Sequence, residues 1–262
     1  MTRVASPRSR RRESVGRAAP PVRPRQRILA VDAGRGIAVL LMVAYHFCFD
    51  LNYFQLAHFD FHHSAFWLAA RGTIVTLFLL LVGVSLHLAC VDGLNRAAYL
   101  RRLAWLVTCA VMVSATSYVM FPSSWIFFGV LHFIALASVL GLLFTRLHYL
   151  NLVLGAAIIA AGLTLHHPWF DHAWLNWIGF VTHKPITEDY VPFFPWFGVV
   201  LLGMFAGGAV LTGRTGRLLR TWRGLAGGDL LGWLGRHSLA VYMLHQPLLL
   251  GALFLLTRLL AN

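Results

Sequence analysis

Residues 28–54, with the sequence ILAVDAGRGIAVLLMVAYHFCFDLNYF, decide the fold class that the chain predicts. The segment is long and apolar enough to cross a bilayer as one helix, for which about 20 residues suffice. It nevertheless contains four ionisable side chains, those of Asp32, Arg35, His46 and Asp50. Such groups are costly inside a membrane unless they face protein or water, so they predict a membrane-spanning helix with a functional polar face.

The spacing of these side chains places them on one face of the predicted helix. Successive residues turn by about 100°, so Arg35 and His46 fall within about 20° of each other. Asp32 and Asp50 lie beside the same line, and the polar stripe between them extends over about 27 Å, close to the thickness of the hydrocarbon core. The sequence therefore predicts a polar path through the membrane.

The composition excludes an ordinary soluble domain. Hydrophobic residues make up 58% of the 262-residue chain and charged residues only 12%, against about 25% charged residues in typical soluble domains. The formal net charge of +13 is concentrated in residues 1–27, which contain nine of the 22 Lys and Arg residues, and in short links between apolar segments. This distribution is typical of membrane topology and predicts the lipid bilayer, not nucleic acid, as the partner.

The sequence contains no pattern for a metal or a permanently bound cofactor. The three cysteines, Cys48, Cys90 and Cys109, lie in or beside apolar segments and are expected to be reduced core residues. The spacings CxxC and HExxH are absent, as is the glycine-rich phosphate loop with its lysine. We therefore expect no metal site and no resident cofactor.

The hydropathy pattern predicts an all-α polytopic bundle of about seven transmembrane helices. Residues 1–27 are expected to form a disordered basic cytoplasmic tail, and residues 28–262 a single transmembrane domain. The predicted spans are 28–51, 65–90, 99–120, 124–144, 148–166, 193–212 and 237–258.

The distribution of basic residues predicts the orientation of this bundle. Lys and Arg residues gather in the tail, in the 91–102 link, at Arg146 and in the 213–236 link. On the opposite side, only Lys184 and Arg258 occur. Because links rich in Lys and Arg stay on the cytoplasmic side, the N-terminus is expected in the cytoplasm and the C-terminus outside.

Asp32 and Arg35 are three residues apart on one helical face, so their charges can neutralise each other. One interpretation is a structural ion pair that fixes the packing of the helix. The other is a cytoplasmic cavity in which the Arg35 guanidinium holds the phosphates of a ligand. The sequence leaves both interpretations open.

His46 and Asp50 are four residues apart, the arrangement in which a carboxylate orients an imidazole that acts as a general base. The alternative is a structural histidine hydrogen-bonded to a neighbouring helix. His132 and His245, on the fourth and seventh spans, are expected at a similar depth. Arg71 on the second span is expected to pair with Asp50 and so join the first two spans.

Arg236 and Ser238 stand at the cytoplasmic start of the seventh span. The free N–H groups of a helix end capped by Ser238, together with the Arg236 guanidinium, would bind an anion such as a diphosphate. A plain capped helix end beside a positive-inside arginine explains the same residues. Both interpretations stay open.

Four strings of sequence point to a family. They are VDAGRGIAVLLMVAYHFCFDL (31–51), FGVLHFIALASVL (128–140), VPFFPWFGVVLLG (191–203) and LGRHSLAVYMLHQP (234–247). In this order they resemble the bacterial family related to the catalytic domain of heparan-α-glucosaminide N-acetyltransferase. The resemblance covers nearly the whole chain after Arg27.

The resemblance implies acyl transfer across the bacterial cytoplasmic (inner) membrane. Cytosolic acetyl-CoA, or another acyl-CoA, would be the donor co-substrate, and an amine or hydroxyl of an extracytoplasmic glycan or other acceptor would be acylated. Related membrane acyltransferases have an arginine and a histidine separated by ten residues on the first span, as Arg35 and His46 are here. A histidine of the first outer link is implicated in the eukaryotic enzyme, which makes His62 and His63 rivals of His46; we prefer His46.

Two other functions are compatible with the sequence. A permease for a sugar or lipid would use the polar stripe as its binding path, without acyl transfer. A haem protein would use two of His46, His132 and His245 as axial ligands. The spacing from Arg35 to His46 favours the enzyme, and the sequence leaves a homo-oligomer open.

Overall fold

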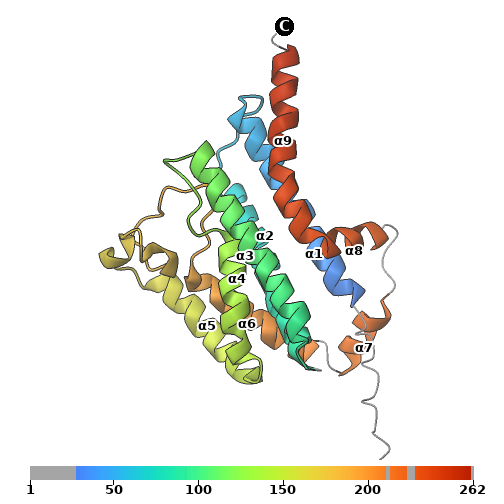
Figure 1. The fold of residues 1–262 in the computed structure, drawn as a ribbon. Coiled ribbons are helices and arrows are strands. Elements are labelled where there is room, and N and C mark those ends of the chain that lie inside the picture. Colours follow the sequence, from blue (N-terminus) through green and yellow to red (C-terminus); the bar gives the residue numbers. More distant parts are fainter. Residues whose placement is uncertain (1–27, 92, 211–212, 223–227, 261–262) are drawn as a thin grey trace, which may run out of the picture.

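The structure, a computed structural model, describes residues 28–91, 93–210, 213–222 and 228–260. The predicted tail, residues 1–27, lies outside these ranges. Within them, every regular element is a helix, which confirms the all-α class (Figure 1).

The helices follow the predicted spans. They are α1 (Leu29–Tyr53), α2 (Ala65–Val91), α3 (Arg96–Met120), α4 (Val130–Gly141), η1 (Leu142–Phe144), α5 (His148–Thr164), η2 (Pro168–Asp171), η3 (Asn176–Ile178), α6 (Phe193–Val210), α7 (Gly213–Thr221), α8 (Gly228–Arg236) and α9 (Ser238–Leu260). Among the described residues, α1, α2, α3 and α9 are long and apolar enough to cross a membrane, and three shorter apolar helices accompany them. The chain is therefore an integral membrane protein in contact with lipid.

The predicted start of the fourth span at residue 124 is wrong, because α4 begins at Val130. The residues before it form a turn that side chains of α3 hold in place. Ser114 Oγ donates to the Ile126 carbonyl at 2.6 Å, and the Ile126 N–H donates to Ser117 Oγ at 3.0 Å. These bonds satisfy the backbone of the turn, so it need not be helical inside the bundle.

The core of the bundle lies between α2, α4 and α6. Its largest fully buried apolar side chains include Leu79, Phe133, Phe197, Leu201 and Met204. Figure 1 shows these helices together with α3 and α5 on one side of the molecule, and α1, α8 and α9 on the other.

Glycines let α2 and α6 approach closely. A Cβ on Gly83 would overlap the carbonyl oxygen of Val200, and a Cβ on Gly203 would overlap that of Leu80. Small residues allow membrane helices to pack backbone against backbone, where van der Waals contact replaces the missing hydrophobic driving force. The reciprocal pair fixes the height at which the two helices cross.

The 213–236 segment, predicted as a link, contains α7 and α8. A Cβ on Gly36 would overlap the carbonyl oxygen of Leu231, and a Cβ on Gly235 would overlap that of Asp32. The backbone of α8 therefore rests directly on the N-terminal third of α1.

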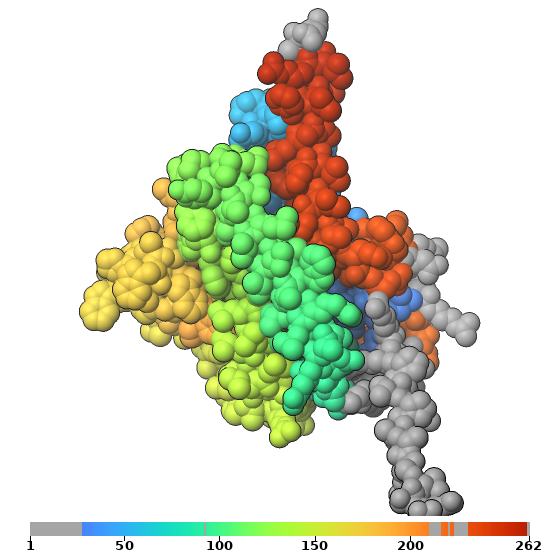
Figure 2. All heavy atoms as spheres, in the orientation of Figure 1, coloured from blue at the N-terminus to red at the C-terminus, as the bar shows by residue number. Residues whose placement is uncertain are grey.

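The first half of α9 packs beside α1, whereas its second half projects beyond the rest of the bundle (Figure 2). Leu255 and Leu259 on this part are 63% and 75% exposed. Apolar side chains with this exposure indicate contact with lipid acyl chains, which are as apolar as leucine itself.

Replacing Gly83 by alanine is expected to destabilise the protein by about 1–3 kcal/mol, because the new methyl group would force the backbone of α6 away. Gly72 on the same helix is the matched control, since a Cβ there meets nothing within 4 Å. Alanine favours helix over glycine by up to about 1 kcal/mol, so Gly72→Ala should leave the Tm unchanged or raise it. Thermal unfolding in detergent measures both shifts, and equal Tm values would contradict the packing of α2 on α6.

Candidate functional site

Two histidines face each other between α1 and α9. The ring centroids of His46 and His245 are 4.9 Å apart, with the rings inclined at 68°. His245 Nδ1 lies 2.7 Å from the Tyr242 carbonyl oxygen. A carbonyl only accepts, so Nδ1 bears the proton and Nε2 keeps its lone pair. This Nε2 atom is buried and has no partner among the described residues.

Asp50 lies in the same layer, one helical turn beyond His46. Asp50 is only 1% exposed, and the side-chain amide of Gln246 donates a hydrogen bond to its Oδ1 atom at 2.7 Å. The predicted ion pair between Arg71 and Asp50 is therefore wrong: within the described ranges, the neighbour that satisfies Asp50 comes from α9, not α2. The reason is that α9 packs against α1 at this depth.

Three buried atoms in this layer lack hydrogen-bond partners in the described part of the chain. They are Asp50 Oδ2, Gln246 Oε1 and His245 Nε2. Asp50 Oδ2 accepts hydrogen bonds when the carboxyl group is ionised, Gln246 Oε1 accepts them always, and His245 Nε2 is an acceptor by the tautomer derived above. Unsatisfied buried polar groups are rare in proteins and require an explanation. The layer is thus suited to a group that donates hydrogen bonds or protons.

Arg71 lies close enough to Lys184, in the segment between α5 and α6, for their charges to interact. Its charge acts on Tyr45 and on Lys184. Desolvation, and next the Arg71 guanidinium, lower the pKa of Lys184, while Asp189 and Glu188 oppose the shift. Arg71, Lys184, Glu188 and Asp189 therefore form a polar cluster of interacting charges. Within the described residues, no ion pair joins Arg71 to Asp50.

Asp189 ties this cluster to α4 and α9. The Val130 N–H donates to Asp189 Oδ2 at 2.8 Å, and the Tyr242 hydroxyl donates to the same oxygen at 3.4 Å. The carboxylate thereby serves an N–H group at the start of α4, where Gly129 offers no capping side chain. Burial raises the pKa of Asp189, and these hydrogen bonds oppose the shift.

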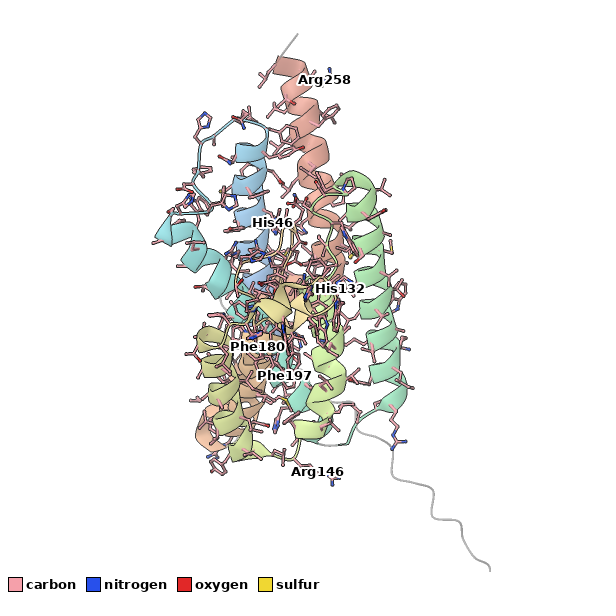
Figure 3. The ribbon with its side chains drawn as sticks, turned by 90° about the vertical axis from the view of Figure 1, so that its left-hand side faces the viewer. His46, His132, Arg146, Phe180, Phe197 and Arg258 are labelled. Carbon is pink, nitrogen blue, oxygen red and sulfur yellow. The ribbon has the colours of Figure 1, made fainter. Side chains whose placement is uncertain are left out.

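His132 does not join the histidine layer in the described structure. Its Nδ1 atom accepts from the Gly129 N–H at 3.3 Å, and its Nε2 atom lies 3.1 Å from Ser114 Oγ. Because Ser114 Oγ donates to Ile126, it accepts from His132 Nε2. Both ring nitrogens are occupied, which indicates a structural role at the start of α4. Figure 3 shows His46 and His132 on separate helices.

The predicted pair of Asp32 and Arg35 is present near the N-terminal end of α1. Arg35 Nη1 lies 3.0 Å from Asp32 Oδ1, and Arg35 Nη2 donates to Ser85 Oγ of α2. Asp32 is buried, whereas the Arg35 side chain keeps 23% of its surface exposed. The bond to Ser85 joins α1 to α2, and part of the Arg35 side chain stays accessible.

The capping role predicted for Ser238 is wrong. α8 ends at Arg236 and α9 begins at Ser238, but backbone bonding continues across the junction. The His237 N–H donates to the Trp233 carbonyl at 3.0 Å, and the Val241 N–H donates to the His237 carbonyl at 3.0 Å. The N–H group that Ser238 would cap is already paired. Arg236 is exposed beside this junction.

A pocket of about 430 Å³ opens beyond the C-terminal end of α1. It is lined by Phe49, Asn52, Tyr53, Gln55, Phe59, Asp60, Phe61 and His62. His62 thus borders the pocket. Its neighbour His63 donates its backbone N–H to Asp60 Oδ1 at 2.8 Å, and its ring Nδ1 lies 3.1 Å from the same oxygen. Hydrogen bonds, first the one from the His63 N–H, lower the pKa of Asp60.

The pocket borders α1, the helix that carries His46. Residues three, four and seven positions apart share one face of a helix. Phe49 and Tyr53, which line the pocket, stand three and seven positions after His46. The pocket and His46 therefore belong to the same face of α1.

Three side chains of the site were not predicted from the sequence: Ser85, Asp189 and Gln246. Gln246 directly follows His245, and Ser85 interrupts an apolar run, so both were detectable as polar residues within a span. Their partners stand 196 and 50 positions away along the chain. No local pattern in the sequence gives such pairings.

The fold and this polar layer define an integral-membrane helical bundle with buried histidine and carboxyl groups between its first and last helices. Comparison with protein families matches residues 27–247 to the family described as Heparan-alpha-glucosaminide N-acetyltransferase, catalytic. The chain belongs to this family, and the resemblance drawn from the four strings is confirmed. Neither the curated proteins nor the solved structures give a match to this chain.

Gln246→Ala is expected to lower the free energy of unfolding by about 1–3 kcal/mol, because it leaves the buried carboxyl group of Asp50 without its donor. Gln55→Ala is the control: Gln55 is exposed, and its amide donates only to the Asn52 carbonyl at 3.2 Å. Thermal unfolding of both purified variants measures the difference. A Gln246→Ala variant as stable as Gln55→Ala would show that the bond to Asp50 does not hold α9 against α1.

Proposed function

We propose that this protein is a membrane acyltransferase that uses cytosolic acyl-CoA as its donor. The acyl group, acetyl in the simplest case, would be transferred to an amine or hydroxyl group of an extracytoplasmic sugar. The observation that supports the proposal most strongly is the family match over residues 27–247, which contains the histidine layer between α1 and α9. The protein would reside in the bacterial cytoplasmic membrane.

The proposal includes seven crossings, made by α1 to α6 and α9, with the N-terminus in the cytoplasm. Consecutive helices of this set run in alternating directions in Figure 1. In Figure 3, Arg146 and Arg258 mark opposite ends of the bundle. Arg146 belongs to the set of basic links and Arg258 to the opposite side, as the positive-inside rule requires for this orientation.

The donor would bind at the N-terminal end of α1. The Arg35 guanidinium is held by Asp32 and Ser85, and 23% of the Arg35 side-chain surface remains exposed. Its planar set of donors matches phosphate oxygens, which acyl-CoA supplies. Arg236, exposed at the junction of α8 and α9, offers a second positive charge at the same end.

The acceptor would bind in the pocket beyond the C-terminal end of α1. Its volume of about 430 Å³ lies in the range of small-molecule sites. Aromatic rings together with carboxylate, amide and imidazole groups line it, a combination that suits the apolar faces and the hydroxyl groups of a sugar. The shared face of α1 leads from this pocket to His46.

In the reaction that we propose, His46 removes the proton from the acceptor amine or hydroxyl as the acceptor attacks the thioester. The carbon–sulfur bond of the thioester breaks, a carbon–nitrogen or carbon–oxygen bond forms, and the proton finally protonates the coenzyme A sulfur. General base catalysis of this kind requires a ring nitrogen within hydrogen-bond distance of the acceptor. Asp50 stays paired with Gln246 and contributes negative charge to the layer.

His46→Ala is expected to lower kcat by about 10²–10⁴-fold, the usual contribution of a general base. The assay is transfer of labelled acetyl groups from acetyl-CoA to amino sugars and polyols by the purified protein in proteoliposomes. His58→Ala, which removes an exposed histidine of the loop after α1, should retain the wild-type rate.

His62→Ala separates the two rival histidines in the same assay. If His46 is the base, this variant changes KM through the pocket and leaves kcat near the wild-type value. A full-rate His46→Ala variant together with an inactive His62→Ala variant would assign the chemistry to the loop instead. Uptake of acceptor in vesicles without any acyl donor would support a permease.

Arg35→Ala is expected to weaken acetyl-CoA binding roughly tenfold to a hundredfold, the loss of a charge-assisted hydrogen bond. Arg35→Lys should lie between this variant and the wild type, since it keeps the charge but not the planar donor set. Arg258→Ala, at the other end of the bundle, is the control. Isothermal titration in detergent provides the affinities, and equal values for all four proteins would exclude Arg35 from the donor site.

A further inference from the structure

The orienting group for His46 was expected to be Asp50, on the same helix. In the structure, the Gln246 amide donates to Asp50 Oδ1 at 2.7 Å, and the ring nearest to His46 across the interface is that of His245. The described residues show no hydrogen bond between His46 and Asp50. The side chain that orients the His46 ring is therefore expected on α9.

We infer that His245 is the positioning residue of the site: its Nε2 lone pair accepts the ring N–H of His46 and thereby fixes which His46 nitrogen is free to act as base. This inference rests on the proposed acyltransferase function. Its physical basis is the Tyr242 carbonyl, which accepts a hydrogen bond from His245 Nδ1–H at 2.7 Å and so leaves the lone pair on Nε2.

The geometry is suited to this role. The two rings meet edge to face with centroids 4.9 Å apart, close enough for a side-chain rotation of His46 to bring its N–H to Nε2. Hydrogen bonds of catalytic groups commonly tighten only when substrate is bound. His245 is 8% exposed, and its Nε2 atom has no other partner in the described ranges, so no competing donor needs to be displaced.

The proton balance of the reaction is then complete. The free nitrogen of His46 takes the proton of the acceptor while the acceptor attacks the thioester carbon. The resulting imidazolium donates its other N–H to His245 Nε2, which spreads the positive charge over two rings in a layer that also contains Asp50. The proton taken from the acceptor then passes from His46 to the departing thiolate, which gives free coenzyme A and restores neutral His46.

Two variants distinguish this role from simple packing. Asparagine places its amide near the position of Nδ1, so His245→Asn retains the bond to the Tyr242 carbonyl and loses the acceptor toward His46. Glutamine places its amide near the position of Nε2, so His245→Gln retains an acceptor toward His46 and loses the bond to Tyr242. If His245 only packs, His245→Asn should have the higher kcat of the two variants. If His245 positions His46, His245→Gln should have the higher kcat.

We expect His245→Asn to lower kcat about 10²-fold with KM and acetyl-CoA affinity unchanged, and His245→Gln to stay within about tenfold of the wild-type kcat. His237→Gln is the matched control, since His237 Nδ1 makes the same kind of bond, to the Trp233 carbonyl at 2.9 Å, on the exposed surface. The reverse order of the two His245 variants, or wild-type kcat in both, would overturn the inference.

A spectroscopic measurement tests the inference without catalysis. In protein with ¹⁵N-labelled histidine, the wild type should show one ring tautomer of His46, retained in His245→Gln and lost in His245→Asn. A His46 spectrum that is identical in all three proteins would overturn the role of His245 whether or not acyl transfer occurs. Absence of acyl transfer by the wild type would instead reject the proposed function alone.

Discussion

Between α1 and α9, the amide of Gln246 donates a hydrogen bond to the buried carboxyl group of Asp50 at 2.7 Å. A buried polar group without a partner costs about 1–3 kcal/mol, so this bond fixes how α9 is inserted against α1. His46 precedes Asp50 by one turn, and His245 directly precedes Gln246. Because the two hydrogen-bonding residues are fixed in register, the rings of the two histidines are brought into edge-to-face contact.

The other end of α1 is fixed by different means. There the backbone of α8 rests on Gly36, and Arg35 reaches across to Ser85 of α2. Between the two ends, Val39 and Met42 are buried, with exposed fractions of 0% and 5%. α1 therefore has two polar regions with a packed apolar one between them.

Three atoms of the histidine layer lack partners among the described residues, and their chemistry indicates which kind of ligand the layer favours. Asp50 Oδ2 and Gln246 Oε1 are carboxylate and amide oxygens, and His245 Nε2 is an acceptor because Nδ1–H donates to the Tyr242 carbonyl. A layer of acceptors surrounded by packed helices favours a proton-donating ligand and disfavours an anionic one. This separates the chemistry of the layer from that of the arginine at the opposite end of the helix, which is suited to anions.

The sequence by itself determined the all-α membrane class, the positions of the long helices, the ion pair of Asp32 with Arg35 and the family, because these depend on local composition, periodicity and ordered strings. Only the tertiary structure decided which helix satisfies Asp50, that His132 is occupied at the start of α4, and that the cap predicted at Ser238 is absent. Those outcomes depend on contacts between residues far apart in the chain, and the side-chain period of a helix says which face is polar but not which helix packs against it.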